Sequence, residues 1–579
     1  MRPKANSLRA ARLSTPVYLS GMIGAVTWTR QRAEAVARKL VANEPSYGVL
    51  VRSGSGMCAM ACSTLWSRIV EQRGDLAGIS GDLSLSDRLI AHWAAHGPAV
   101  LNLAQVASAI AVWDDEAREL SLVRDPLGFE PLYFVRGAEG AAFATRSDVF
   151  GRLDEAYRRP DLEALVADLS FRTNLGRSFF QGVEQVRPGE IVTIAEGQVS
   201  HYRWWNPDQT PLRFTSAKAM VREYRSLLEQ SVVAAMAGGG RVLATHLSAG
   251  LDSSVVTAIA ANVRAAGSRH VALTGVPDPA LLPVGDIRLV NEGVLAAAVA
   301  GSLRAVEHRC VRARGDPVAA MIGAPSRYHQ PLPNPHNQGL FASLQDEASV
   351  VGADRLLIAQ TGNYTFSMSA SARSLARGPW RRLRALVSGQ SRPAKWFLRD
   401  DAALPDPAGP VPADGPARRL YHLRGMNPGA LLHGVREHWR LRPVDPFADR
   451  RLVEFSLRLP EDQLAALGPR GLARSIAGDL LPLAVMRERR RGYQSADWIS
   501  RCQRHADGFA ALIAGCRDHD ELSAVLDIDA LDDALRRLRA ITRPTAADER
   551  LYRIEWPRAV ALAAFVLACD GWTLAAETS

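Results

Sequence analysis

A run of small and hydroxyl residues between His246 and Ser254 has the composition of a phosphate-binding loop. It follows a short apolar run at residues 242–245 and precedes an alanine-rich stretch of helical composition. A strand, a turn and a helix start in this order direct backbone N–H groups at an anion, and Gly250 permits close approach. Asp252 cannot bind a phosphate directly, so its carboxylate is expected to hold a divalent cation that bridges to the phosphates.

The spacing Ser-x-Gly-x-Asp-Ser-Ser in this run resembles the PP-loop of ATP pyrophosphatases, which cleave ATP to AMP and pyrophosphate. The P-loop of kinase-like NTPases is excluded because it needs a Gly-Lys pair, and none of the four lysines follows a glycine. An ordinary serine-rich helix cap is the alternative that the motif alone leaves open. The resemblance implies ATP and Mg²⁺ as cofactors, with Asp252 as a metal ligand. The residues expected to contact ATP are Leu247, Ser248, Gly250, Leu251, Asp252, Ser253 and Ser254.

Length, charge and cysteine content narrow the class of protein. A chain of 579 residues is too long for one core, so two or more domains are expected. The net charge is +10, but nearly all of it is arginine spread along an alanine-rich chain, as genomic base composition would produce, so no nucleic-acid partner is expected. Six cysteines without regular spacing indicate a reducing cytoplasm. The longest apolar run, residues 559–569, is too short to span a bilayer, so no membrane partner is expected.

The chain divides into two regions with different hydrophobic patterns. Short strands with turn signals fill residues 21 to about 205, and residues 109–114 and 120–125 read as a hairpin around an acidic turn. From about residue 215, long alanine- and leucine-rich helices alternate with single buried strands, which is typical of an α/β domain with a parallel sheet. We expect a disordered extension over residues 1–19, one domain over residues 20–210 and a second over residues 215–579.

Both regions resemble asparagine synthetases. The stretches that match the glutaminase-type domain of these enzymes are residues 111–114, 124–128, 131–133 and 143–145. Those that match the synthetase domain are the PP-loop and residues 446–449 and 459–462. The resemblance covers nearly the whole chain. It implies a two-domain α/β protein, an N-terminal Ntn-hydrolase-like αββα domain followed by a parallel-sheet ATP-pyrophosphatase synthetase domain.

One departure from this family concerns the source of nitrogen. Glutamine hydrolysis in the family needs a cysteine at the mature N-terminus, whose free amine acts as the base. Here no cysteine occurs before Cys58, and Ser20 occupies the place of the family's Cys-Gly-Ile start. Ser20 could act as a nucleophile only after removal of the residues before it, and nothing in the sequence suggests that cleavage. We therefore expect this domain to make no ammonia.

A synthetase domain without an ammonia supply must use an amine already present on its substrate, as β-lactam synthetase, carbapenam synthetase and the lasso-peptide macrolactam synthetases do. The stretches that resemble the lasso cyclases are residues 330–337, 360–367 and 489–498. The resemblance implies an ATP-dependent ligase that adenylates an Asp or Glu side chain of a leader-free precursor peptide, which the peptide's own N-terminal amine then attacks. It also implies a leader peptidase of the same pathway as a partner. An asparagine synthetase using free ammonia and a non-catalytic peptide-binding scaffold remain open.

Four residues in these stretches have roles implied by the resemblance. Asn363 matches an aspartate that binds the metal–pyrophosphate, and its amide oxygen can still ligate Mg²⁺; a left-handed loop-capping Asn is the alternative. Gln360 replaces the residue that supports substrate deprotonation in relatives, which suits a peptide amine with a pKa near ~8 that is already partly neutral. Arg490 stands at the place of the family's catalytic lysine, which implies that it stabilises the pyrophosphate and the developing oxyanion. The alternative is that the arginine run is a solvated basic surface. Gly362 is expected to contact ATP.

Overall fold

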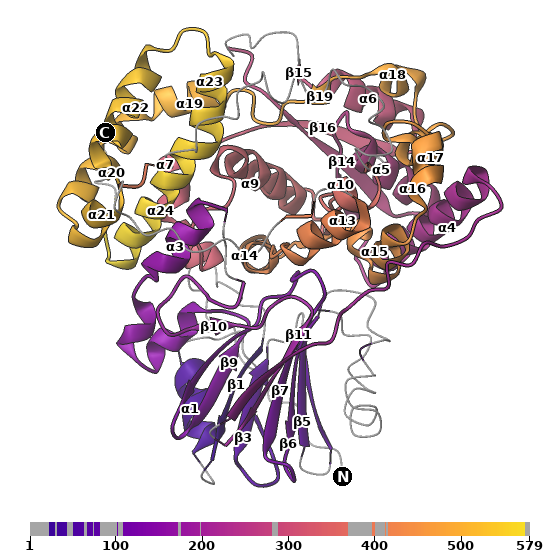
Figure 1. The fold of residues 1–579 in the computed structure, drawn as a ribbon. Helices are drawn as coiled ribbons and strands as arrows, with labels where there is room; N and C mark the ends of the chain where they lie inside the picture. Colours follow the sequence, from indigo (N-terminus) through magenta and orange to yellow (C-terminus); the bar gives the residue numbers. More distant parts are fainter. Residues whose placement is uncertain are drawn as a thin grey trace.

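Two parts with different sheets make up the molecule (Figure 1), as a computed structural model shows. The two-domain α/β fold class is confirmed, whereas the boundaries at residues 19, 210 and 215 stay predictions. The structure describes residues 22–28, 32–42, 50–62, 67–72, 75–81, 101, 108–171, 175–196, 198–280, 288–368, 397–399, 411–412 and 415–573. Ser20 and the predicted extension lie outside these residues.

The N-terminal part contains two antiparallel sheets. One has the order β10 (Glu184–Gln185), β8 (Tyr133–Gly137), β9 (Gly140–Ala144), β1 (Met22–Thr27), β3 (Cys58–Cys62) and β2 (Val51–Arg52). The other has the order β12 (Gln198–Arg203), β11 (Glu190–Ala195), β7 (Glu119–Arg124), β6 (Ser108–Asp114), β5 (Asp75–Gly81) and β4 (Ser67–Gln72). The predicted hairpin at residues 109–125 is confirmed, because β6 pairs with β7 and places Trp113 opposite Leu120.

Alternation along β1 explains how the first sheet packs on both faces. Met22 and Val26 join a core that also holds Trp113 of the second sheet. Ile23 and Ala25 point to the opposite face and pack in the cluster that contains α1 (Ala33–Leu40). Successive side chains of a strand face opposite sides, so a strand that is apolar at every position is buried on both.

The C-terminal part is built on a parallel sheet. Its order is β16 (Val306–Arg312), β14 (Arg269–Val276), β13 (Val242–His246), β17 (Arg355–Leu357) and β18 (Arg442–Val444). The helices between successive strands include α5 (Leu251–Val263), α6 (Gly293–Ser302), α9 (Pro335–Val350) and α14 (Gly429–Trp439). The chain runs from β13 outward to β14 and β16, then returns to β17 on the other side of β13. Open parallel sheets bind ligands at the carboxyl ends of the strands where the order reverses in this way.

A helical layer follows the sheet in the sequence and lies to one side of it (Figure 1). It contains α19 (Trp498–Arg504), α20 (Ala506–Arg517), α21 (Asp520–Val525), α22 (Ile528–Ala540), α23 (Ala546–Arg550), a π-helical turn (Leu551–Glu555) and α24 (Trp556–Cys569). The apolar run at residues 559–567 is the buried face of α24, where Phe565 lies 5.5 Å, centroid to centroid, from Phe180 of the N-terminal part. None of the described helices is long and apolar enough to cross a membrane.

Buried ion pairs join the two parts around α14. Arg436 on α14 donates to both carboxylate oxygens of Glu130, at 2.5 and 2.6 Å, and both side chains are almost fully buried. Asp148 faces Arg146 at 2.6 Å and His329 at 3.3 Å. Burial alone would raise the pKa of Asp148, but these two neighbours lower it far below its usual range. Ion pairs therefore connect the N-terminal part to α14 and to the loop that begins at His329.

Candidate active site

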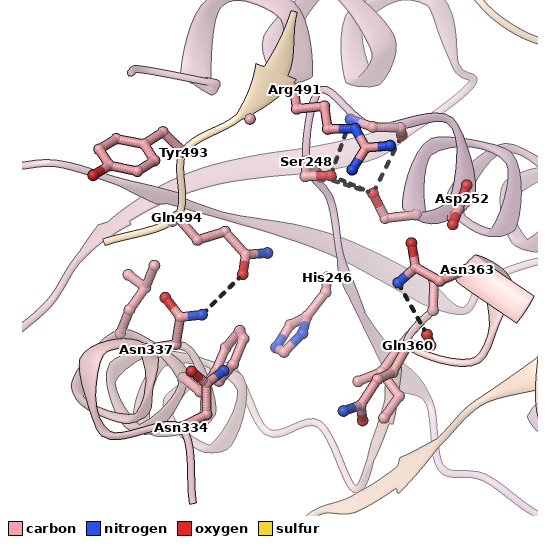
Figure 2. A pocket seen from close by; sticks show the side chains of 18 of the residues that line it. His246, Ser248, Asp252, Asn334, Asn337, Gln360, Asn363, Arg491, Tyr493 and Gln494 are labelled. Carbon is pink, nitrogen blue, oxygen red and sulfur yellow. Dashed lines mark hydrogen bonds between the residues drawn. The ribbon is translucent and has the colours of Figure 1, made fainter. Parts of the chain in front are cut away.

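The predicted phosphate-binding loop lines a cavity of about 1830 Å³ at the carboxyl edge of the parallel sheet. The loop connects β13 to α5, at the point where the strand order reverses. Figure 2 shows Ser248 and Asp252 on one side of the cavity, with His246 at the end of β13 between this loop and the wall formed by α9. The sequence motif is therefore placed where this kind of sheet binds ligands.

Hydroxyl groups give the loop its shape. The Ser248 hydroxyl lies 2.8 Å from that of Ser253 and accepts the Gly250 N–H at 3.0 Å. Ser254 is fully buried, does not line the cavity, and donates its hydroxyl to the Ser248 carbonyl at 3.0 Å, so it supports the loop from behind rather than meeting ATP. No side chain caps the start of α5, which leaves the first-turn N–H groups available to an anion. Leu247 and Leu251 are nearly buried at the loop's base.

Asp252 is held by Ser367, which ends one of the matched stretches, and by Arg470, which the sequence did not single out. Its carboxylate accepts a hydrogen bond from Ser367 and lies 3.4 Å from a guanidinium nitrogen of Arg470. Arg470 also donates to the Ser367 hydroxyl at 2.8 Å. Burial raises the pKa of Asp252, and these donors offset the rise only in part. Gly362 is buried and packs against this carboxylate. A Cβ at this position would lie only 2.9 Å from Asp252 Oδ2. Its place in the site is to make room for Asp252, which differs from the predicted contact with ATP.

The donor set around Asp252 suits a magnesium ion that keeps water and phosphate ligands. Within the described residues, no three His, Cys, Asp or Glu side chains gather to form a complete metal cage. Mg²⁺ bound to a nucleotide commonly takes only one or two protein carboxylates, so Asp252 with the Asn363 amide oxygen matches that chemistry. Asn363 donates its amide N–H to the Gln360 carbonyl at 3.4 Å and lies between Asp252 and Gln360 (Figure 2). It belongs to helix α10 (Gly362–Thr365), so the left-handed alternative is wrong.

Asp445 positions the loop that carries Gln360. Its carboxylate accepts the N–H of Thr361 at 2.7 Å and that of Phe447 at 3.0 Å. Complete burial raises the pKa of Asp445 to about 6. Gln360 itself is exposed at the cavity, where a neutral amide can orient a substrate group without taking its proton.

Two arginines of the predicted run reach the cavity. Arg490 donates to Glu488 at 2.8 and 3.1 Å, and Glu488 also accepts the N–H groups of Arg489 and Arg490. These hydrogen bonds lower the pKa of Glu488 to about 2, so the pair persists at neutral pH. Arg491 is exposed and points toward Ser248 (Figure 2), and among the described residues no carboxylate pairs with it. Arg491 therefore stands beside Arg490 as a candidate cation for the phosphates.

Glu292 links the arginine run to the phosphate-binding loop. It is 6% exposed and accepts the Ala249 N–H at 3.1 Å. Gly492 packs so closely on it that a Cβ there would lie 2.1 Å from Glu292 Oε1. The short strand β19 (Arg491–Gly492) also pairs with β15 (Arg288–Leu289). In the sequence, the glycine that follows three arginines is the only feature that indicates this contact. No motif around Glu292 marks it as a partner.

Comparison with known proteins places this site in a family. The sequence model of the glutamine amidotransferase domain matches residues 83–205, and that of asparagine synthase matches residues 223–568. Because the second match covers more than half of the chain, the chain belongs to the asparagine synthase family. The predicted resemblance to the asparagine synthetase family is thereby confirmed.

Individual relatives match over shorter stretches. The glutamine-hydrolyzing asparagine synthetase 3 of Bacillus subtilis (strain 168) is 33% identical over 161 residues, 26% of this chain and 25% of that protein. The chain thus spans about a quarter of the length of this curated relative. Two solved structures are also similar, a glutamine phosphoribosylpyrophosphate amidotransferase from B. subtilis with ADP and GMP and an allosteric regulatory enzyme of purine biosynthesis. The first is 12% identical with a TM-score of 0.22, and the match covers 39% of this chain and 60% of that chain. The second is 12% identical with a TM-score of 0.23, and the match covers 52% of this chain and 81% of that chain.

Proposed function

We propose that this protein closes a macrolactam ring in a leader-free peptide, as lasso cyclases do. The acceptor is an Asp or Glu side chain of the peptide and the nucleophile is the peptide's own N-terminal amine. ATP supplies the driving force, and a leader peptidase of the same pathway supplies the substrate. The observation that carries the proposal is that the three stretches resembling lasso cyclases, distant in the sequence, all contribute residues to the cavity that holds the PP-loop.

The reaction takes place in two steps, adenylation and then amide formation. An oxygen of the acceptor carboxylate attacks the α-phosphorus of ATP, and pyrophosphate leaves. The amine nitrogen then attacks the acyl carbon, AMP leaves with the electron pair of the broken C–O bond, and the nitrogen loses a proton to solvent. Asp252 and Asn363 would hold Mg²⁺, which neutralises phosphate charge when bound. Ser248, Ser253 and the start of α5 orient the phosphates, while Arg490 and Arg491 supply positive charge where negative charge develops.

The size of the cavity and one sequence position support a large substrate with its own amine. Pockets for small ligands commonly measure about 300–1,000 Å³, whereas this cavity measures about 1830 Å³ within the described residues. The residue two positions before β1 is Ser20, where glutamine-hydrolysing relatives are expected to have their cysteine nucleophile. A peptide amine that is partly neutral at neutral pH also needs no strong base, which suits Gln360.

Incubation with ATP, Mg²⁺ and leader-free precursor peptide tests the proposal. We expect a product lighter than the peptide by one water, together with equal amounts of AMP and pyrophosphate. A peptide with an acetylated N-terminus should be adenylated without closing a ring, and one with Asn or Gln at the acceptor position should release no pyrophosphate. Pyrophosphate release with free aspartate and ammonium, but with no peptide, would contradict the proposal.

Asparagine formation from free ammonia is the second candidate. The match to a Bacillus subtilis asparagine synthetase favours it. It predicts saturable, aspartate-dependent AMP production that ammonium stimulates. The same assay therefore separates the two functions by the substrate that is consumed, and a chain that consumes neither would be a non-catalytic scaffold.

A further inference from the structure

One wall of the cavity carries neutral amide side chains. Asn334 and Asn337 lie at the start of α9, and Gln494 follows β19. We call these three residues the amide wall. In Figure 2 they lie together on the far side of His246 from Ser248 and Asp252. All three line the cavity, so the amide wall and the phosphate-binding loop bound the same space from different sides.

The amide wall holds one buried hydrogen-bond acceptor that the protein does not satisfy. Asn337 is 7% exposed and donates its amide N–H to Gln494 Oε1 at 3.4 Å, but its own Oδ1 is buried without a partner. A buried acceptor without a donor costs free energy that a ligand N–H would recover. Asn334 is exposed, and its side chain does not cap α9. The wall therefore offers at least one unused acceptor and further amide groups at the cavity surface.

The backbone beneath these side chains is rigidly held. Arg553 donates to the carbonyls of Gln494 and Ser495, at 2.5 and 2.9 Å, and its guanidinium lies 4.2 Å from the ring centroid of Tyr493. The N–H of Tyr493 donates to the Leu289 carbonyl at 2.9 Å. Asn334 has a φ of 50°, a left-handed conformation that fixes its direction at the start of the helix. These contacts thus position the backbone of Gln494 and of Asn334, whose side chains are exposed at the cavity.

The chemistry of the wall suits peptide groups. An amide side chain both donates and accepts, as a peptide group does, and carries no charge. The charged α-carboxylate and α-ammonium of a free amino acid would instead call for opposite charges. We propose that Asn334, Asn337 and Gln494 bind main-chain N–H and C=O groups of the ring-forming segment, the residues between the peptide's amine and its acceptor side chain. This assignment rests on the proposed function, and it explains how the amine end is presented to an adenylate held at the PP-loop.

Kinetics of side-chain variants test the assignment. Gln494→Leu and Asn334→Gly each remove an exposed amide, and glycine tolerates the positive φ of Asn334. We expect KM for the leader-free peptide to rise roughly 2- to 10-fold in each, the value of about one hydrogen bond, with KM for ATP unchanged. Gln230→Leu is the matched control, since Gln230 is an exposed amide on α4 (Ala217–Met236) away from the cavity. An unchanged peptide KM in both variants would overturn the assignment.

Backbone-methylated peptides give a second readout. N-methylation of one peptide bond in the ring-forming segment removes one N–H donor without changing any side chain. The probe is a non-cyclisable peptide with Asn or Gln at the acceptor position. Methylation at the position that meets the wall should weaken its binding to the wild type. The same methylation should not weaken binding to Asn337→Leu any further, because this variant already lacks the acceptor. Additive losses at every position would refute the contact. If the wild type cyclises no peptide, the proposed function fails instead, and the two failures are thereby distinguished.

Discussion

The interface between the two parts and the cavity beside β13 both hold charged side chains in ion pairs, and the cavity adds an exposed cation that has no carboxylate partner among the described residues. At the interface every carboxylate named above faces a cation of the protein, as Glu130 faces Arg436 and Asp148 faces Arg146. At the cavity, Asn337 leaves an acceptor unmatched, and Arg491 has no carboxylate partner among the described residues. Charges balanced within the protein hold its parts together, whereas groups left unmatched at a cavity are available to a ligand. Variants at the two places test this contrast.

The largest effect is expected from Asp252→Ala. Removing this carboxylate deletes the metal ligand from the phosphate-binding loop and leaves Arg470 without its ion pair. ATP–pyrophosphate exchange and peptide cyclisation should fall below detection, while the circular dichroism spectrum and Tm stay close to the wild type. Asp479→Ala is the control, because this exposed carboxylate does not line the cavity. Substantial exchange by the Asp252 variant would contradict the PP-loop assignment.

At the interface, Glu130→Gln should act on stability instead of chemistry. It leaves the buried Arg436 guanidinium without its counter-charge, and breaking a buried pair typically costs about 3–5 kcal/mol. Urea unfolding should show this loss, while exchange per folded molecule stays near normal. Replacing both partners, with Glu130→Leu and Arg436→Met, should recover most of the stability, since no charge is left unpaired. A catalytic loss without a stability loss would show that the interface is part of the active site.

Arg490→Ala should lower kcat by roughly 10²–10³, as loss of one group that stabilises developing charge commonly does. We expect Arg491→Ala to cost at least as much, because Arg491 points toward Ser248 while Arg490 pairs with Glu488. The Lys variants should recover part of the rate, since lysine keeps the charge but loses the bidentate fork. Arg489→Ala is the matched control, because Arg489 does not line the cavity. Changes in KM alone would make the run a docking surface.

The smallest effect is expected from glutamine. The resemblance places Ser20 where glutamine-hydrolysing relatives are expected to carry their cysteine. Incubation with glutamine should release no glutamate above the background of a protein-free sample, and cyclisation should proceed equally well without it. Ser20→Cys is a useful companion and should not by itself create activity, because the free amine that serves as base is also required. Clear glutamate formation by the wild type would show that the N-terminal part keeps its chemistry.

Local features of the site were predictable, and contacts between distant segments were not. Ser248, Gly250 and Asp252 share one strand–turn–helix unit, whose geometry follows from residue type and spacing. Arg470 lies 218 positions from Asp252, and only the fold brings them together. In the sequence, only a Gly-Pro-Arg-Gly turn marks the position of Arg470. In the structure, Arg470 takes a left-handed conformation in this turn. The hairpin β6–β7 and the strand β13 were similarly predictable, because their short apolar runs are bounded by turn signals, whereas sheet order depends on long-range packing.

The contact between Gly492 and Glu292 has a consequence for exchanging parts between related enzymes. Glu292 ties the arginine run to the Ala249 N–H, and no larger side chain fits at Gly492 without displacing the Glu292 carboxylate. Glu292, Gly492 and the loop at Ala249 therefore form one unit that is best exchanged together. A chimera that imports a foreign loop with a larger residue at position 492 would displace the Glu292 carboxylate and disturb its hydrogen bond to the Ala249 N–H. Libraries meant to change peptide specificity should vary the amide wall and leave this unit intact.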